Sequence, residues 1–75
     1  MITEKDIKNA IQTSVMGFDV ENLKNDEDFV DAGMDSLDHL SILLNLEESY
    51  GVKKIPDEDV DLCRSIAGIL DYLSK

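Results

Sequence analysis

A long amphipathic helix in the middle of the chain, predicted over residues 36–50, constrains the fold more than any other feature. Asp35 and Ser36 are residue types that favour helix N-caps, and Gly51 is of the type that ends helices. At 100° per residue, one side of this helix is apolar and is expected to face a core. That side holds Ile42, Leu43, Leu46 and Tyr50. The opposite side, expected to be solvated, holds Asp38, Ser41, Asn45 and Ser49.

A third part of the same helix lies between these two sides. It holds Leu37, Leu40, Leu44, Glu47 and Glu48. With these leucines, the apolar surface covers more of the circumference than a small helix bundle needs to bury. Either the helix is packed on two sides, or the three leucines form an exposed ridge edged with carboxylates. The periodicity alone leaves both arrangements open.

Helical periodicity predicts three further helices. The first follows a capping sequence, Thr3-Glu4-Lys5-Asp6, and is about four turns long, ending at Gly17. A short third helix begins at Pro56 and ends near Cys63. Ser65 can cap a last helix. The positions at helical spacing are Ile7, Ala10, Ile11, Ser14 and Val15 in the first helix, and Ile66, Ile69, Leu70 and Leu73 in the last.

Two details of the later helices are also predicted. Val60 and Leu62 of the third helix are expected to point inward. Gly68 lies inside the last helix, where glycine costs about 1 kcal/mol relative to alanine.

Residues 18–35 form a long connection that is too apolar for a free linker. Its apolar residues are Phe18, Val20, Leu23, Phe29, Val30 and Met34. We expect it to fold back over the core, with a helical turn at residues 26–30. The sequence therefore predicts an all-α fold: a small four-helix bundle of three longer helices and one short third helix, with a long structured loop between helices one and two. This fold is a single domain over residues 1–75.

The cysteine and histidine content excludes several classes of site. Cys63 is the only cysteine and His39 the only histidine, so neither a disulfide framework nor a Cys/His metal site can form. We expect Cys63 to act as a small apolar residue, and a chain without disulfides suits a reducing cytoplasm. An acidic run at residues 57–61 has the spacing of calcium-loop ligands, but Leu62 and Gly68 stand where such a loop needs Gly and Glu. We also expect no signal peptide and no membrane-spanning segment.

Acidic residues dominate the middle of the chain. The formal net charge is −10, and no lysine or arginine lies between Lys24 and Lys53. The acidic residues in that interval are Asp26, Glu27, Asp28, Asp31, Asp35, Asp38, Glu47 and Glu48. This charge argues against nucleic-acid binding and favours partner proteins with basic faces.

The Ser36 hydroxyl is the strongest candidate for a chemical role. We expect it to be exposed at the positive end of a helix dipole, where free backbone N–H groups would stabilise a phosphate ester. A plain N-cap is the simpler interpretation of Ser36. A Ser-His pair with His39, three positions later, is thinkable, but the sequence indicates no oxyanion hole and we expect His39 to face solvent. We predict no catalytic residue.

Several features together resemble the acyl carrier protein family over essentially the whole chain. The tetrapeptide Asp35-Ser36-Leu37-Asp38 opens a helix in the middle of a very acidic chain of 75 residues, and Pro56-Asp57-Glu58 follows about twenty positions later. The resemblance implies that Ser36 holds a covalent 4′-phosphopantetheine arm, attached from coenzyme A by a phosphopantetheinyl transferase. It also implies a carrier rather than an enzyme. We expect a cytoplasmic monomer that binds acyl-transferring and synthase enzymes through their basic docking faces.

The resemblance suggests roles for two further groups of residues. The partner-binding face would comprise Asp35, Leu37, Asp38, Leu40, Ser41, Leu44, Glu47 and Glu48. A pocket for an acyl chain would be lined by Ile42, Leu46, Ile55, Val60, Leu62 and Ile69.

Three departures from the usual pattern of fatty-acid carriers affect the expected pathway. Ser41 stands where a glutamate is usual, Asn45 where a small apolar residue is usual, and Lys53-Lys54 adds positive charge to a loop that is usually acidic. They make a dedicated carrier for a specialised lipid, polyketide or aminoacyl pathway a serious alternative to general fatty acid synthesis. An alternative from another class is an unmodified acidic helical adaptor that binds a basic partner through residues 36–50.

Overall fold

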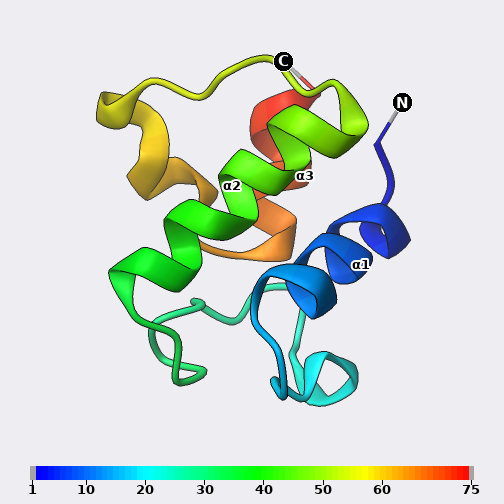
Figure 1. Ribbon diagram of the computed structural model, residues 1–75. Coiled ribbons are helices and arrows are strands. Elements are labelled where there is room, and N and C mark those ends of the chain that lie inside the picture. The colour runs from blue at the N-terminus through cyan, green and yellow to red at the C-terminus, as the bar shows by residue number, and fades with distance from the viewer. Residues whose placement is uncertain (1, 75) are drawn as a thin grey trace.

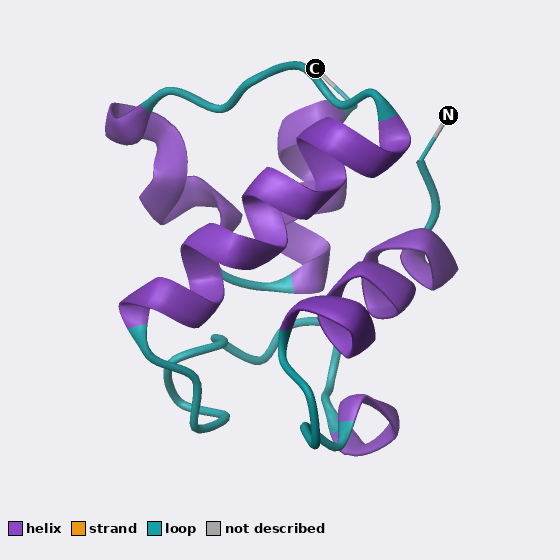
Figure 2. Cartoon of the chain, in the orientation of Figure 1, coloured by secondary structure: helices purple, strands orange, loops and turns teal. Residues whose placement is uncertain are grey.

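The structure, a computed structural model that describes residues 2–74, consists of helices and loops, with no strand in that range (Figure 2). Its elements are α1 (Glu4–Ser14), the single turn η1 (Val20–Asn22), α2 (Ser36–Tyr50), the 3₁₀ helix η2 (Asp57–Cys63) and α3 (Ile66–Leu73). Figure 1 shows α2 crossing the front of the molecule, with α1 on one side of it and η2 on the other. The predicted all-α bundle, with a short third helix and a long loop after the first, is confirmed.

The first helix begins where the sequence predicted and is shorter than expected. Asp6 N–H donates to Thr3 Oγ1 over 3.2 Å, and Thr3 N–H donates to the Asp6 carboxylate over 3.0 Å, which forms a capping box. The helix ends at Ser14 after 11 residues, about three turns rather than four.

A polar network joins α1 to α2. The Asn45 side-chain amide donates to Ala10 O, Thr13 Oγ1 and Ser14 Oγ over 3.2, 2.7 and 2.9 Å. Ser49 Oγ in turn donates to the Asn45 side-chain oxygen over 2.7 Å. Asn45 is therefore half-buried between the two helices, and its predicted solvated position was wrong.

The loop between α1 and α2 folds over the core as predicted. Phe29 in this loop is fully buried, and its N–H donates to Arg64 O over 2.7 Å. The Arg64 guanidinium also pairs with Asp28, with 2.9 Å between Nε and Oδ2. The predicted helical turn at residues 26–30 was wrong, since these residues form non-helical turns and the loop's helical turn is η1.

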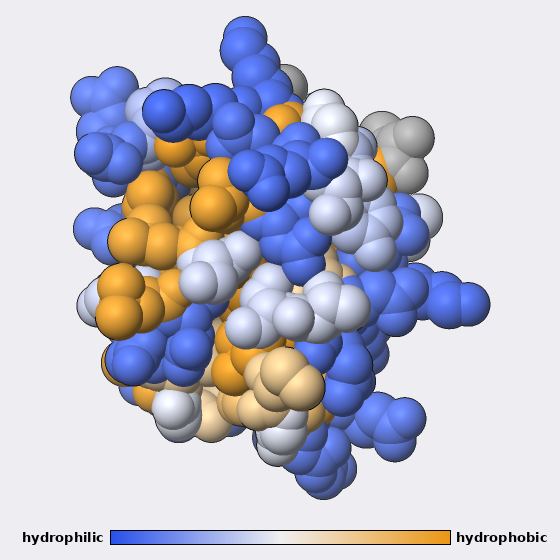
Figure 3. All heavy atoms as spheres, viewed as in Figure 1, coloured by the Kyte–Doolittle hydropathy of each residue, from blue (hydrophilic) through white to orange (hydrophobic). Residues whose placement is uncertain are grey.

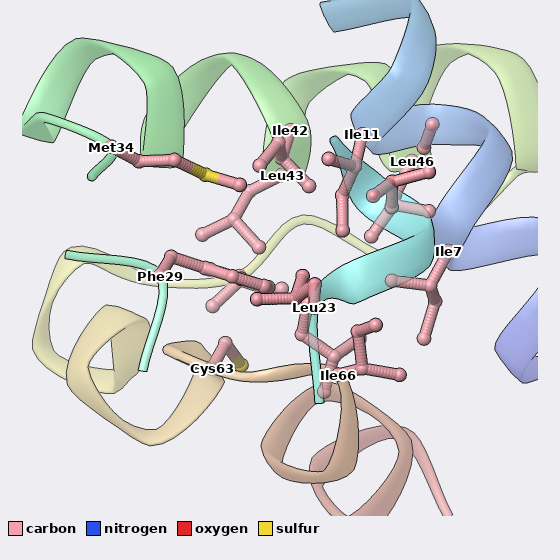
Figure 4. Close-up of a cluster of buried hydrophobic side chains, with 14 residues drawn as sticks. Ile7, Ile11, Leu23, Phe29, Met34, Ile42, Leu43, Leu46, Cys63 and Ile66 are labelled. Carbon is pink, nitrogen blue, oxygen red and sulfur yellow. The ribbon is translucent and has the colours of Figure 1, made fainter. Parts of the chain in front are cut away.

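The core lies between α2 on one side and α3 with η2 on the other. No Cα atom of α2 lies within 8 Å of a Cα atom of α3 or η2, so side chains fill the space between these helices. Figure 4 shows Phe29 reaching into this space with Leu23 and Cys63 nearby. The buried apolar residues are Ile7, Ala10, Ile11, Val20, Leu23, Phe29, Met34, Ile42, Leu43, Leu46, Ile55, Cys63, Ile66 and Ile69.

The core side of α2 was predicted correctly except at its last residue. Ile42, Leu43 and Leu46 are buried, but Tyr50 is 40% exposed. Tyr50 is the final residue of the helix, directly before the left-handed C-cap at Gly51 (φ 68°), where the chain turns away.

The third helix ends at Cys63 as predicted, but the inward orientation expected for Leu62 was wrong. Leu62 is 60% exposed, whereas Val60 is half-buried and Cys63 is fully buried. A 3₁₀ helix has three residues per turn, so Val60 and Cys63 share one face and Leu62 points elsewhere. Pro56 is the residue before the helix rather than its first.

The last helix shows why a glycine is present at position 68. Ser65 caps α3 by accepting from Gly68 N–H over 2.9 Å, as predicted, and Ile66 and Ile69 are buried. A Cβ atom added to Gly68 would lie 2.7 Å from the Leu62 carbonyl oxygen. The close approach of η2 to α3 therefore depends on the missing side chain.

Replacing Gly68 with alanine will destabilise the protein, although alanine is the better helix former. The new methyl group clashes with backbone, and overpacking of this kind costs about 1–3 kcal/mol. Urea unfolding followed by circular dichroism measures the change. Ala67→Gly, at the exposed neighbouring position, is the control and will lose about 0.5–1 kcal/mol through helix propensity alone. A higher midpoint for Gly68→Ala would contradict the predicted clash.

Candidate functional site

The start of α2 leaves the Ser36 hydroxyl free. Asp35, not Ser36, is the N-cap: its carboxylate accepts from Asp38 N–H over 2.8 Å, and the Asp38 carboxylate accepts from Asp35 N–H over 3.3 Å. This reciprocal pair is a capping box. The interpretation of Ser36 as a plain N-cap was therefore wrong, and its side chain is exposed in the first turn.

The backbone around Ser36 suits an anionic ester. Within residues 2–74, the amide N–H groups of Ser36 and Leu37 have no hydrogen-bond acceptor, since the cap carboxylate takes only that of Asp38. They point along a helix of 15 residues whose dipole is positive at this end. A phosphodiester on the Ser36 oxygen would lie beside these donors, so the residues present fit a phosphate-linked group.

An exposed leucine ridge runs from this helix start along α2. Leu37 is 73% exposed, Leu40 47% and Leu44 52%, which decides between the two arrangements left open by the sequence. The exposed Leu62 of η2 adds to the apolar surface on this side of the molecule. Figure 3 shows apolar atoms gathered over the half of this face where η2 and the first turns of α2 lie, edged by hydrophilic residues.

The charges near the ridge are of one sign. Asp35 and Glu48 are exposed, Asp38 and Glu47 are half-buried, and α2 contains no lysine or arginine. An acidic rim around apolar contacts suits a partner with a basic face, because complementary charge steers encounter and orients the complex.

The one histidine is part of the core and not of a catalytic pair. His39 is 6% exposed, so the expectation that it faces solvent was wrong. Its Nε2 lies 2.7 Å from Cys63 O, and its ring meets Phe29 edge-on with 5.6 Å between ring centroids. The periodicity held the relevant signal, because His39 lies one turn before the buried Ile42 and Leu43 and so shares their face. The ring is directed away from the exposed Ser36, which removes the Ser-His alternative.

The Cys63 thiol is inert in the folded protein. It is fully buried, and burial raises its pKa to about 11, with a further contribution from the carboxylate of Asp59. At neutral pH the thiol stays protonated and is not a nucleophile.

The described part of the chain contains no metal-ligand cluster and has two surface grooves. No group of three His, Cys, Asp or Glu residues between positions 2 and 74 could hold a metal ion, and none of the helices there is long and apolar enough to cross a bilayer. Two surface grooves of about 790 and 500 Å³ lie at the other end of α2 and beside η2. Their apolar linings include Tyr50, Val52 and Leu70 in the first, and Pro56, Leu62 and Tyr72 in the second.

Four of the six residues expected to line an acyl pocket are packed in the core instead of bordering open space. Ile42, Leu46 and Ile69 are fully buried and Ile55 is nearly so. Of the expected set, Leu62 alone borders either of the two grooves described above.

Comparison with known proteins agrees with the geometry of this helix start. A family described as "Phosphopantetheine attachment site" matches residues 5–73. The chain is 41% identical over 61 residues to an acyl carrier protein of Syntrophobacter fumaroxidans, covering 80% of this chain and 74% of that protein. It is 33% identical over 78 aligned positions to an acyl carrier protein of Chlorobium phaeovibrioides, covering 99% of both. It is also 36% identical to a mitochondrial acyl carrier protein of Dictyostelium discoideum, over 99% of this chain and 63% of that protein.

Both the family match and two relatives above 30% identity extend over most of the chain. The chain therefore belongs to the acyl carrier protein family, whose members are carriers rather than enzymes and hold a covalently attached 4′-phosphopantetheine.

Proposed function

We propose that this protein carries acyl groups as thioesters on a 4′-phosphopantetheine arm attached to Ser36, and passes them between the enzymes of one pathway. The observation that supports this most is the exposed Ser36 hydroxyl in the first turn of α2, relieved of capping by Asp35. The arm, when attached, supplies a thiol at the end of a flexible tether. Tethering keeps the cargo at high effective concentration near an active site on a docked enzyme.

In this proposal the residues of this chain bind the partner enzyme and present the Ser36 hydroxyl to it, and the partner enzyme carries out the chemistry. The phosphopantetheinyl transferase deprotonates the Ser36 hydroxyl and supplies the metal ion. Asp35 holds the helix start in place, the free amides of Ser36 and Leu37 stabilise the ester phosphate, and the leucine ridge provides the contact surface.

The partner-binding face in this proposal consists of Asp35, Leu37, Asp38, Leu40, Ser41, Leu44, Glu47 and Glu48. The exposed leucines support it, because buried apolar contacts supply most of the binding energy at an interface. Exposed ion pairs contribute only about 0–1 kcal/mol each, so the acidic rim mainly sets the rate and orientation of docking. Weak pairing suits a carrier that must leave each enzyme.

A long acyl cargo would be held inside the bundle by Ile42, Leu46, Ile55, Val60, Leu62 and Ile69. Removing each methylene from water yields about 0.8 kcal/mol, which favours this location for long chains. Because most of these residues are packed together, α2 and η2 must separate for the chain to enter.

The pathway we propose is a dedicated one rather than general fatty acid synthesis. Asn45 supports this, since it fixes α1 to α2 through three hydrogen bonds where a small apolar residue is usual. Ser41 also lowers the negative charge of the partner face, and Lys53-Lys54 lies exposed after α2. We place the protein in the cytoplasm, with no nucleic-acid or membrane partner and as a monomer. Fractionation of source cells tests this location against the mitochondrial one named for the Dictyostelium relative.

Co-expression with a phosphopantetheinyl transferase will raise the intact mass by one phosphopantetheinyl group. The Ser36→Ala variant will keep its unmodified mass, because no other hydroxyl lies at the start of α2. Ser49→Ala, which removes an exposed hydroxyl from the same helix outside the proposed partner-binding face, is the matched control and will be modified. An unmodified wild-type protein would favour the acidic adaptor instead.

The modified protein will have one thiol that reacts rapidly with Ellman's reagent at pH 8, and the unmodified protein none. The raised pKa of Cys63, about 11, and its burial keep this thiol protonated and shielded, whereas the arm's thiol is exposed. Denaturant will release one further thiol in both forms. Rapid reaction of the unmodified native protein would contradict the assignment of Cys63 as inert.

Replacing Leu40 with aspartate will raise the KM for the transferase at least tenfold while circular dichroism stays unchanged. The change puts a charge where the partner's apolar surface must bind, and central apolar contacts carry most of the binding energy. Met16→Asp alters an even more exposed apolar residue that is not part of α2, and it is the control. Equal effects of the two variants would remove the leucine ridge from the docking surface.

A further inference from the structure

The seam between α2 and η2 is crossed by a single polar side-chain bond among the described residues. His39 Nε2 and Cys63 O lie 2.7 Å apart although the residues are 24 positions apart in sequence. A carbonyl oxygen can only accept, so Nε2 is the donor in this bond. No Cα atom of η2 lies within 8 Å of a Cα atom of α2, so this contact depends on the reach of the His39 side chain.

The remaining polar contacts of η2 lead away from α2. Tyr72 Oη of α3 donates to Asp59 Oδ2 over 2.7 Å. Just after η2, Arg64 O accepts from Phe29 N–H in the loop. No side chain caps the N-terminus of this short 3₁₀ helix. Breaking the His39 bond would therefore free η2 from α2 while α3 and the loop still hold it.

Apolar residues lie on both sides of the same seam. Leu40 and Leu44 of α2 and Leu62 of η2 are exposed, and Ile42, Leu46 and Cys63 of the same two helices are fully buried in the core. An alkyl chain tethered at Ser36 would thus meet apolar surface from the outside to the core. The bond between His39 Nε2 and Cys63 O is the one polar side-chain bond between α2 and η2 that such a chain would have to pass.

We propose that His39 is a positioning residue that acts as a latch: its bond to Cys63 O holds η2 closed against α2, and it breaks when a long alkyl chain enters the core. This inference rests on the proposed carrier function and specifies how the cargo reaches the interior. Short or polar acyl groups leave the latch closed, because they gain too little burial to open it. The latch thereby sorts acyl cargo by chain length.

Nitrogen-15 NMR of the His39 ring tests the latch in the wild-type protein. The modified protein is loaded with an acetyl group or an octanoyl group, and intact mass confirms each loading. We expect the Nε2–H resonance to keep its hydrogen-bonded shift in the acetyl form and to move in the octanoyl form. An unchanged resonance in the octanoyl form would overturn the proposal.

Variants supply a second readout, the rate at which hydroxylamine cleaves the thioester. In the His39→Leu variant the Cys63 carbonyl lacks its donor in the closed state, in which η2 lies against α2. The variant therefore destabilises the closed state relative to the open state that admits the chain. One net hydrogen bond corresponds to a shift of about three- to tenfold in such an equilibrium. We expect cleavage of the octanoyl form to slow by about that factor and cleavage of the acetyl form to stay unchanged.

Two further variants separate the latch from simple loss of stability. His39→Gln keeps a donor at a similar position and will restore the wild-type cleavage rate. Tyr72→Phe removes the bond between η2 and α3, lowers the melting temperature and leaves the cleavage ratio unchanged. Equal changes in His39→Leu and Tyr72→Phe would overturn the latch. If the wild-type protein accepts no acyl group at all, the carrier proposal itself fails, which is a separate outcome. If His39→Leu does not fold, the nitrogen-15 resonance of His39 in the wild-type protein decides whether the latch opens.

Discussion

The reciprocal bonds between Asp35 and Asp38 are the interaction on which the site depends. Each carboxylate satisfies the other residue's backbone N–H, so the first turn of α2 is capped without help from the serine between them. Had Ser36 been the cap, its hydroxyl would have been committed to the backbone, and esterification would have removed a cap worth about 0.5–2 kcal/mol. The cap thus allows one residue to be rigidly placed and chemically free at once.

The sequence was sufficient for the positions of the helices and the exposure of Ser36, and insufficient where periodicity changes or a polar residue enters the core. Helix α2 ran from Ser36 to Tyr50 as predicted because its signals, a cap and a terminal glycine, are local. Leu62 was misplaced because its orientation follows from the 3₁₀ geometry of η2, and capping residues do not distinguish this helix type from an α-helix. Asn45 and His39 were assigned to solvent because they are polar. Their burial depends on acceptors in α1 and in η2 that only the fold brings near.

Helix α2 packs differently against α1 than against η2 and α3. Toward α1 the contact is short and polar, and three hydrogen bonds from Asn45 fix it. Toward η2 and α3 the backbones stay apart and side chains fill the interval. A bundle of this size has a small core and little stability to spare. The bonds toward α1 therefore add to its stability, and the wider apolar side toward η2 and α3 is where the acyl chain in our proposal would be held.

The burial of Phe29 has a consequence for engineering this chain. Because a loop residue supplies the ring at the centre of the core, residues 18–35 behave as a further packing element beside α1, α2, η2 and α3. Labels, linkers or affinity tags inserted there will disturb the folded state. The segment between Gly51 and Pro56, whose residues are mostly exposed, is the better place to open the chain for fusion or circular permutation.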